Sequence, residues 1–304
     1  MKIIVTGGAG FIGSHAVDHL INDGHKVLVI DNLSTGKLNN LNHKADFENI
    51  DITDSRISDV VKAFDPNVIS HFAAQTSVSI STNNPILDAN SNIIGSMKVF
   101  DAMNETECRN FIYINTGGAL YGDPEYLPLD ESHRINPISP YGLSKWTTER
   151  YLLMQKKPYQ HVKTLRLSNV YGPRQDAFGE AGVVSIFSNK MLSGEPVTIF
   201  GDGKQTRDFV YVEDVVEAFK QVIKKDETFS VNISSGKTVS INELYELMSE
   251  ICRNSILPNY ESVRHGDLMH SVLSNKLASE LFGWVPRVDL VEGIKRTLSW
   301  HASN

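Results

Sequence analysis

The feature that most constrains the fold is a set of glycines close to the start of the chain. Gly7, Gly10 and Gly13 directly follow the apolar run Lys2–Thr6. Apolar residues then recur every four positions, at Ile12, Ala16 and Leu20. This pattern predicts a β-strand, a tight turn and an α-helix. In such a unit Gly7 permits the turn, Gly10 lets a pyrophosphate approach the backbone, and Gly13 lets helix and strand pack closely. The sequence therefore predicts a dinucleotide-binding turn.

The rest of the first half alternates short apolar runs with amphipathic stretches. The predicted strands are Lys2–Thr6, Lys26–Ile30, Asn67–Phe72, Asn110–Asn115 and Val162–Ser168. Their nearly continuous apolar character is typical of strands that are covered on both faces, and strand–helix alternation predicts right-handed crossovers. The expected fold class is α/β, with a Rossmann-type, doubly wound parallel sheet.

After about residue 168 turn signals become frequent and the predicted helices become short, as at Asn242–Arg253 and Asp289–Ser299. We expect a nucleotide-binding domain over residues 1–168. A smaller C-terminal substrate-binding lobe is expected over residues 169–304, interleaved with the first domain and separated from it by a cleft.

A carboxylate follows the second predicted strand. Asp31 lies 18 residues after Gly13, about where a carboxylate binds the adenosine ribose hydroxyls of a dinucleotide. It would repel the 2′-phosphate of NADP, and Asn32, Leu33 and Ser34 supply no arginine to offset that repulsion. The sequence therefore predicts NAD as the cofactor.

A tyrosine and a lysine lie four residues apart in Tyr141-Gly142-Leu143-Ser144-Lys145 and share a face if this segment is helical. An ammonium beside a phenol favours the phenolate and is expected to lower the tyrosine pKa from about 10. Such a phenolate can take a proton from a sugar hydroxyl. The same spacing recurs at Tyr159 and Lys163, but that copy runs into the strand Val162–Ser168, so we interpret it as accidental.

Composition limits the partners. The formal net charge of -7 argues against general nucleic-acid binding, and no apolar run is long enough for a membrane span. Cys108 and Cys252 form neither a CxxC pair nor a zinc motif, so a metal site is not expected. The expectation is a cytoplasmic protein without nucleic-acid or membrane partners.

Taken together, these motifs resemble the extended short-chain dehydrogenase/reductase family, most closely its UDP-glucose 4-epimerase group. The resemblance also covers His71-Phe72-Ala73-Ala74-Gln75, Asn92-Ile93-Ile94-Gly95, Tyr121-Gly122, Asn169-Val170-Tyr171-Gly172-Pro173-Arg174, Arg207-Asp208, Arg264-His265-Gly266-Asp267 and Gly283-Trp284-Val285-Pro286.

The resemblance implies the roles of individual residues. Tyr141 would be the general acid/base and Lys145 would bind the nicotinamide ribose. The residues expected at NAD are Gly7, Gly10, Phe11, Ile12, Gly13, Asp31, Asn32, Asp51, Ile52, Ala73, Ala74, Gln75, Asn92, Tyr141 and Lys145. The residues expected at a UDP-sugar are Asn169, Val183, Phe200, Arg207, Arg264, Asp267 and Ser271. Two arginines suit a diphosphate, because guanidinium groups bind phosphate oxygens bidentately.

Two positions depart from the family pattern. The Ser or Thr expected four residues before Tyr121 is Gly117, so Thr116, a water or another side chain would have to supply the third catalytic group. The segment also lacks the acidic residues of sugar-nucleotide dehydratases and decarboxylases. Ser271 stands where narrow-specificity epimerases tend to carry a tyrosine, which favours acceptance of an N-acetylated sugar.

The predicted function is inversion of C4 of a UDP-hexose through a 4-keto intermediate, with NAD held throughout. Two alternatives remain: a 4-keto-sugar-nucleotide reductase or dehydratase of the same family, and a dinucleotide-sensing protein without catalysis. The apolar helices near Ile93–Met103 and Tyr141–Leu153 are those through which family members often form homodimers, so a homodimer is expected.

Overall fold

The computed structural model describes residues 1–177, 182–253, 256–263 and 268–303. Its first strand, β1 (Lys2–Thr6), is buried after its first residue, and its side chains alternate between two apolar cores. Ile3 and Val5 belong to one core and Ile4 belongs to the other. This alternation is what a strand covered on both faces requires.

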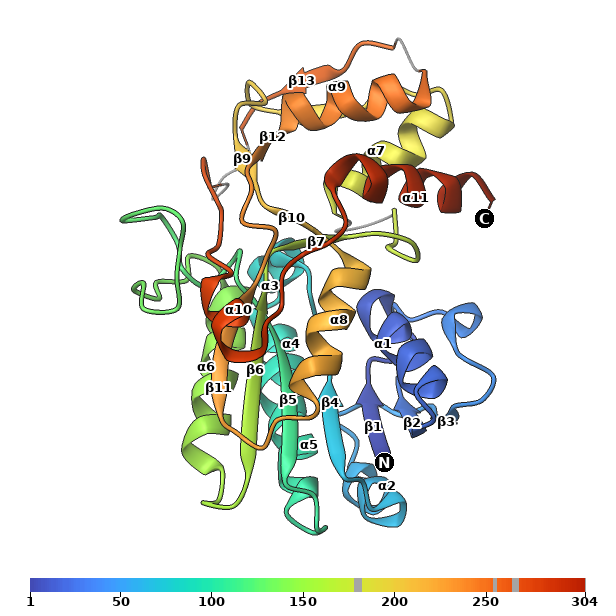
Figure 1. Ribbon diagram of the computed structural model, residues 1–304, viewed down its shortest axis with the longest axis vertical. Helices are drawn as coiled ribbons and strands as arrows, with labels where there is room; N and C mark the ends of the chain where they lie inside the picture. Colours follow the sequence, from blue (N-terminus) through green and yellow to red (C-terminus); the bar gives the residue numbers. More distant parts are fainter. Residues whose placement is uncertain (178–181, 254–255, 264–267, 304) are drawn as a thin grey trace.

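A seven-stranded sheet surrounds β1, and all of its neighbouring strands are parallel (Figure 1). In spatial order its strands are β11 (Phe229–Ile233), β6 (His161–Leu167), β5 (Asn110–Thr116), β4 (Val68–His71), β1, β2 (Lys26–Ile30) and β3 (Asp46–Glu48). The chain leaves β1 in one direction towards β3 and in the other towards β11. The carboxyl ends of β1 and β4 therefore form the switch point at which open α/β sheets bind ligands. The Rossmann-type parallel sheet predicted from the sequence is confirmed.

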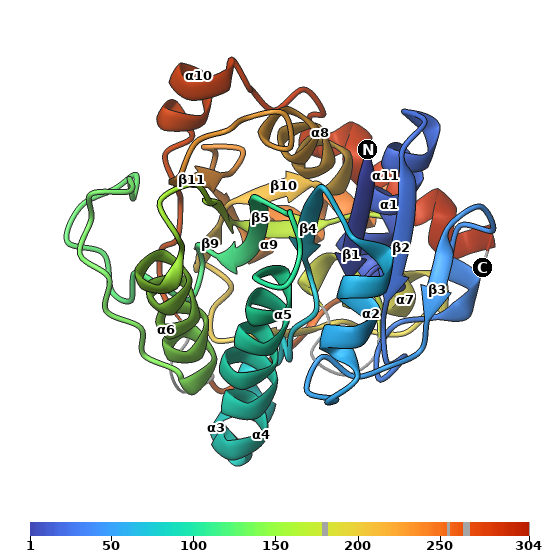
Figure 2. The same cartoon turned by 90° about the horizontal axis from the view of Figure 1, so that it is seen from below.

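Helices cover both faces of the sheet (Figure 2). One face carries α1 (Phe11–Asn22), α8 (Val212–Val222) and α10 (Lys276–Phe282). The other face carries α2 (Ile57–Phe64), α5 (Ser96–Met103) and α6 (Pro140–Gln155). A short 3-10 turn, η1 (Leu38–Asn40), follows β2, and α3 (Val78–Asn83), α4 (Pro85–Ala89) and the π-helical η2 (Asn90–Gly95) lead into α5.

Two strands of the sheet, β3 and β11, are missing from the sequence-based prediction. β3 has only three residues and its two acidic ones, Asp46 and Glu48, are exposed. In β11 the polar Ser230 and Asn232 interrupt the apolar run, because both side chains hydrogen bond to buried groups inside the sheet layers. Neither segment has the continuous apolar character by which the other strands were predicted.

The second half of the chain contributes to both parts of the molecule. β11, α8 and α10 lie beyond residue 168 and complete the layers of the large sheet. The division into two domains at residue 168 stays a prediction. The positions of these three segments agree with the expectation that the second half of the chain is interleaved with the first domain.

The remaining elements form the smaller lobe. Its strands pair as β10 (Phe209–Tyr211) with β7 (Asn169–Tyr171), β12 (Val239–Ser240) with β9 (Thr206–Arg207), and β13 (Asn259–Glu261) with β8 (Thr198–Phe200). Its helices are α7 (Val183–Leu192), α9 (Ile241–Cys252) and α11 (Leu290–Ser303). These helices and strands share a separate apolar core around Phe187, Tyr211 and Leu244.

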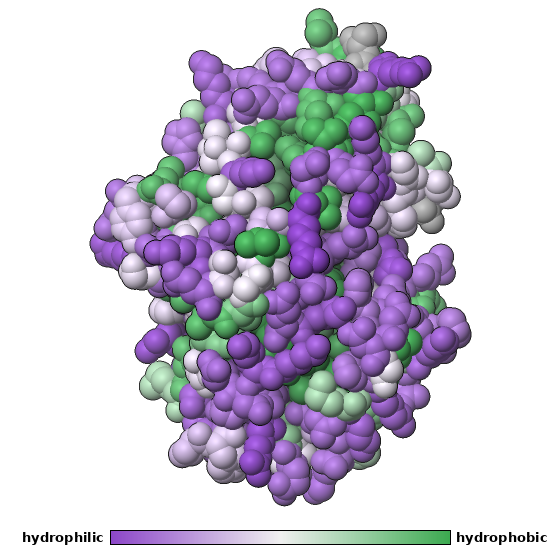
Figure 3. Space-filling model, viewed as in Figure 1, coloured by the Kyte–Doolittle hydropathy of each residue, from purple (hydrophilic) through white to green (hydrophobic). Residues whose placement is uncertain are grey.

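The face in Figure 3 is mostly hydrophilic over the large sheet and carries a larger group of apolar side chains over the smaller lobe. Within the described residues we find no helix that combines the length and the apolar character that crossing a bilayer would take.

Candidate functional site

The turn after β1 has the close contacts that only glycine permits. Gly7 has a φ of +69°, and a Cβ there would lie 2.6 Å from the Ala73 nitrogen. A Cβ on Gly13 would lie 2.2 Å from the Gly7 carbonyl oxygen. The Gly10 N–H donates to this oxygen over 3.1 Å. The turn therefore brings the start of α1 against the ends of both β1 and β4.

The N-terminus of α1 is suited to a phosphate group. Its N-cap is Gly10, no side chain caps it, and its first turn carries no acidic residue. The N–H groups of a helix start carry partial positive charge, so an uncapped start fits a pyrophosphate. The side chains of Phe11 and Ile12 pack against the core of the smaller lobe, which fixes the helix start from that side.

Asp31 connects the glycine turn to the end of β2. Its carboxylate is nearly buried, at 7% exposure, and accepts the Ala9 N–H at 3.0 Å and the Leu33 N–H at 2.8 Å. Each oxygen keeps a further lone pair for a ribose hydroxyl. The position of the Asp31 carboxylate is compatible with a contact to a ribose, and the binding of ribose by Asp31 stays a prediction.

The next predicted pair, Asn32 and Asp51, is joined directly: the Asn32 amide donates to Asp51 over 2.6 Å. Partial burial acts to raise the pKa of Asp51, but hydrogen bonds from Thr53 and Asn32 outweigh it and lower that pKa. Ile52 is buried and lies against Gly95, where a Cβ would come within 2.7 Å of the Ile52 side chain.

Two hydrogen bonds join the backbone of Gln75 to the side-chain amide of Asn92. The Gln75 N–H donates to the Asn92 side-chain oxygen, and the Asn92 amide donates to the Gln75 carbonyl, both over 2.9 Å. Both side-chain amides also donate to the buried Asp88. Ala73 and Ala74 precede this pair at the end of β4. Sequence reasoning missed Asp88, whose only signal is its spacing of four residues from Asn92.

Asn92 lies in the π-helical turn η2. The backbone carbonyl of Asn92 accepts hydrogen bonds from the Ser96 hydroxyl at 2.6 Å and from the Thr148 hydroxyl at 2.7 Å. Ser96 also hydrogen bonds to the ring of His71. Burial, and secondarily the charge of Lys145, lowers the pKa of His71 to about 3, so this ring is neutral at physiological pH. The π-turn had no recognisable sequence signal.

Tyr141 lies in the first turn of α6. Ser139 caps this helix by accepting the Gly142 N–H, Pro140 is its first residue, and the Tyr141 N–H donates to Ser81 over 3.1 Å. The Thr116 side chain lies near the Tyr141 phenol and acts to lower its pKa. The structure thus brings together the predicted tyrosine and the displaced threonine.

Lys145 does not act on Tyr141 as the sequence reasoning expected. Its Nζ donates to the Ile114 carbonyl over 2.7 Å and lies 4.4 Å from the centre of the Tyr113 ring. Burial lowers the pKa of Lys145 to about 7, against the opposing effects of Asp88 and Glu149. Burial and the nearby Asp88 raise the pKa of Tyr141, against the opposing effect of Thr116. The expected lowering of the Tyr141 pKa is therefore wrong for the protein alone, because desolvation of the phenolate dominates.

The glycine at position 117 has a packing reason. A Cβ there would lie 2.2 Å from Cδ1 of Leu273, which is fully buried, while the Gly117 N–H donates to the Leu167 carbonyl. Leu273 thus occupies the space that a serine or threonine side chain would need. The available hydroxyl is the one on Thr116, which also accepts the Ala119 N–H.

The predicted substrate residues of the second half lie on the smaller lobe. Asn169 begins β7 and its N–H donates to the Asp208 carbonyl. Val183 begins α7, Phe200 ends β8, Arg207 ends β9, and the Ser271 N–H donates to the Thr206 carbonyl. Arg264 and Asp267 lie outside the described residues.

Asp208 holds this region together, and sequence reasoning gave it no role. Its buried carboxylate accepts hydrogen bonds from Ser168, Ser235, Gly236 and Leu273. These bonds connect the start of β7 with two loops and hold the chain beside Ser271 near the end of β5.

The second Tyr–Lys pair is not helical. Tyr159 is half exposed before β6, and Lys163 is buried inside β6, where its Nζ donates to Asn110. The interpretation of this copy as accidental agrees with its place in a strand.

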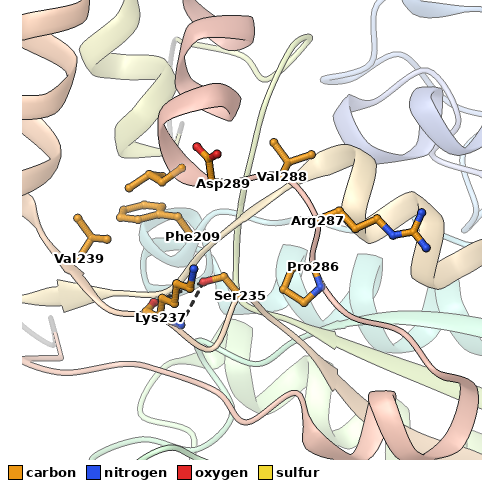
Figure 4. Close-up of a pocket in the computed structure, with 9 residues that line it drawn as sticks. Phe209, Ser235, Lys237, Val239, Pro286, Arg287, Val288 and Asp289 are labelled. Atoms are coloured by element: carbon orange, nitrogen blue, oxygen red, sulfur yellow. Dashed lines mark hydrogen bonds between the residues drawn. The ribbon is translucent and has the colours of Figure 1, made fainter.

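A separate cavity of about 140 Å³ lies between β10, the loop at Ser235 and Lys237, and the segment leading into α11 (Figure 4). None of the predicted site residues lines it. Among the described residues no group of three or more His, Cys, Asp or Glu side chains could hold a metal ion.

Comparison with known proteins extends over nearly the whole chain. Residues 3–234 match the NAD dependent epimerase/dehydratase family. The UDP-glucose 4-epimerase of Mycolicibacterium smegmatis is 40% identical over 99% of this chain and 98% of its own length.

Two solved structures add substrate information about the relatives. The UDP-glucose 4-epimerase of Thermotoga maritima, determined with UDP-glucose, is 45% identical, with a TM-score of 0.96 over 99% of this chain and 98% of that one. The UDP-N-acetylglucosamine 4-epimerase of Methanobrevibacter ruminantium, in complex with UDP-N-acetylmuramic acid, is 35% identical, with a TM-score of 0.93 over 99% and 98%. The family resemblance drawn from the sequence motifs is confirmed.

The contact between Gly117 and Leu273 predicts a compensating pair of substitutions. Gly117→Ala should reduce the free energy of unfolding by about 1–3 kcal/mol, because the new methyl group overlaps Leu273. In a Leu273→Ala background the same change should cost less, which denaturant unfolding of the four proteins would measure. Gly118→Ala is the control, since its Cβ would meet no atom closer than 4.0 Å. Equal costs of Gly117→Ala in both backgrounds would contradict the packing explanation.

Proposed function

This chain belongs to the NAD-dependent epimerase/dehydratase family, and on that premise we propose that it inverts C4 of a UDP-hexose through a 4-keto intermediate. The substrate is UDP-glucose or UDP-galactose, or an N-acetylated or uronic acid relative. The observation that carries the proposal is the cluster of Thr116, Tyr141 and Lys145 at the carboxyl end of β5, on the same sheet edge as the glycine turn.

Tyr141 and Thr116 form the proton-transfer pair. Because the Thr116 side chain lies near the Tyr141 phenol, a sugar hydroxyl that binds between them can pass its proton to Tyr141 once that phenol is ionised. Burial resists this ionisation, so positive charge must accumulate near Tyr141 during the reaction. Lys145 is one source of this charge, since the ammonium and neutral forms are both populated near neutral pH.

NAD, when bound, supplies the hydride acceptor and donor and a positively charged ring. The backbone of Gly7, Gly10, Phe11, Ile12 and Gly13 would hold its pyrophosphate. Asp31 would hold its adenosine ribose. The other residues proposed at NAD are Asn32, Asp51, Ile52, Ala73, Ala74, Gln75, Asn92, Tyr141 and Lys145.

The smaller lobe would hold the UDP group. Arg207 ends β9 and is partly buried, so its guanidinium suits one side of a diphosphate. Phe200 ends β8 and offers a ring on which uracil can stack. Asn169, Val183, Arg264 and Asp267 complete the proposed UDP site, with Ser271 beside the sugar.

The two alternatives differ from an epimerase in their use of cofactor. A 4-keto-sugar reductase consumes NADH or NADPH in stoichiometric amounts, whereas an epimerase regenerates its NAD in each turnover. A dinucleotide-sensing protein needs no proton-transfer pair. The proximity of Thr116 to Tyr141, together with relatives that are 4-epimerases, favours the epimerase.

We also propose a homodimer formed through α6 and the segment α4–η2. On α6 the side chains of Leu143, Tyr151 and Met154 are 46–73% exposed and recur at helical spacing. On the neighbouring segment Ile86 is 74% exposed and Ile94 is 49% exposed. An exposed apolar patch of this kind, formed by adjacent helices, is typical of a surface that pairs with its own copy. We also predict a cytoplasmic location and a role in galactose metabolism or polysaccharide biosynthesis.

Replacing Tyr141 by Phe tests the proposed function. Turnover of UDP-hexose should fall by about 10²–10⁴-fold, because the proton acceptor is lost while the ring remains. The amount of NAD that co-purifies, measured after denaturation of the protein, should stay at the wild-type level. A Tyr141→Phe protein that turns over UDP-glucose at the wild-type rate would rule out the proposed role.

The buried, small Ser271 predicts a broad substrate range. The protein should epimerise UDP-N-acetylglucosamine as well as UDP-glucose, since no bulky side chain is expected beside C2 of the sugar. Ser271→Tyr should then lose the N-acetyl substrate and retain UDP-glucose. Product stereochemistry for both substrates, read by NMR, measures this. An enzyme active on UDP-glucose alone would contradict the prediction.

The apolar stripe on α6 predicts the oligomeric state. Met154→Glu should shift the protein from dimer to monomer in sedimentation equilibrium, because it places a charge in the proposed interface. Met269→Glu is a matched control, since this methionine is also half exposed but lies on the smaller lobe. A wild-type protein that is monomeric at micromolar concentration would disprove the dimer.

A further inference from the structure

The end of β5 that carries Thr116 extends past its neighbour β4. The last residue of β4, His71, pairs with Tyr113, so residues 114–116 of β5 have a strand partner only in β6. Backbone groups alternate in direction along a strand, and the Gly117 N–H points to β6. The Ile114 carbonyl and the Thr116 N–H therefore point to the side that β4 no longer covers.

Two side chains bind these backbone groups. Lys145 from α6 donates to the Ile114 carbonyl over 2.7 Å, and the Asn115 side-chain oxygen accepts the Thr116 N–H at 2.8 Å. The Thr116 N–H is thus held by the side chain of its own neighbour instead of by a carbonyl of a second strand. The conformation of Thr116 depends on where the Asn115 amide is held.

The Asn115 amide is held by α6. Its nitrogen donates to Glu149 over 2.6 Å and to the Lys145 carbonyl at the longer distance of 3.5 Å. Glu149 follows Lys145 by one helical turn and is fully buried. Asn115 therefore joins the strand end that carries Thr116 to the helix that carries Tyr141.

Glu149 is itself fixed from the other side. Arg166 of β6 donates to both of its oxygens, over 2.6 and 3.2 Å, and Ser230 of β11 donates over 2.8 Å. With the bond from Asn115, each carboxylate oxygen accepts two hydrogen bonds. A buried carboxylate that is paired and fully bonded in this way has one well-defined position.

We propose that Asn115, held by the Glu149–Arg166 ion pair, is a positioning residue that sets the Thr116 hydroxyl beside the Tyr141 phenol. The inference rests on the proposed function. An amide can accept the Thr116 N–H through its oxygen and donate to Glu149 through its nitrogen at once. An aspartate would set a second carboxylate against Glu149, and an alanine would leave both groups without this partner.

Asn115→Ala, with Ser230→Ala as the matched control, is the first test. Both remove one hydrogen bond to Glu149, but only Asn115 also binds Thr116. In the NAD-loaded enzyme Asn115→Ala should lower kcat about tenfold with little change in KM, because a misplaced proton relay slows the chemistry. Ser230→Ala should stay within about twofold of wild type in both constants. A wild-type kcat in Asn115→Ala would overturn the inference.

The second test separates positioning from loss of stability. If Asn115 acts through the Thr116 hydroxyl, Asn115→Ala should change kcat by less than about twofold in a Thr116→Ala background. The same tenfold loss in both backgrounds would assign Asn115 a merely structural role. Thermal unfolding of each variant checks that it is folded at the assay temperature.

A third measurement needs no catalysis. Hydrogen exchange followed by NMR should show faster exchange of the Thr116 and Ala119 N–H groups in Asn115→Ala than in Ser230→Ala, since the first donates to Asn115 and the second to Thr116. Unchanged exchange would overturn the inference. If the wild-type protein epimerised no UDP-hexose, the proposed function would fail, and this measurement would still decide the positioning of Thr116.

Discussion

The close approach of α1 to β1 is the constraint on which the site depends. It requires that Gly13 touch the Gly7 carbonyl and that Gly7 touch the backbone of Ala73, so two strands and a helix meet within a single turn. The same turn presents the Ala9 N–H to Asp31. A larger side chain at Gly7 or Gly13 would separate these elements and move several predicted cofactor contacts together. The glycines therefore stabilise one arrangement of the ends of β1, β2 and β4, on which several of the contacts proposed for NAD depend.

The buried charged groups between β5 and α6, Glu149, Arg166 and Lys145, contribute little to the stability of the fold. Removing an ion pair such as Glu149–Arg166 from water costs several kcal/mol per ion, which its attraction and hydrogen bonds only partly offset. Lys145 is buried beside it, no carboxylate of the described part of the chain forms an ion pair with it, and its pKa falls to about 7. Apolar side chains of similar volume could fill this space without the desolvation free energy that buried charges require. Such an arrangement is typical of sites where precise position and an adjustable proton matter more than stability.

Sequence reasoning succeeded where a pattern has a local cause. β1 and β2 lie at their predicted residues because unbroken apolar runs form buried strands, and the glycine spacing identified the turn. It failed where the cause is distant in the chain. The strand β11 was not predicted because its polar residues hydrogen bond to Tyr121 and Glu149, which are distant in the sequence. The glycine at position 117 departs from the family pattern because Leu273, also distant in the sequence, occupies the space of a side chain there. The pKa of Tyr141 was misjudged because spacing from Lys145 carries no information about desolvation.

The smaller lobe is attached to the cofactor turn itself, which links the two proposed binding sites. After β7, the Pro173 carbonyl accepts a hydrogen bond from His15 of α1, and Arg174 pairs with Asp18 of the same helix at 2.7 Å. Burial lowers the pKa of His15 to about 4, so a neutral ring donates this bond across the physiological range. Phe11 and Ile12 pack against the core of the smaller lobe at the same place. The helix start proposed to hold the pyrophosphate cannot shift without moving the lobe proposed to hold the UDP group. Such coupling suits a reaction in which the cofactor and the UDP group keep their relative position while the oxidised sugar turns between them.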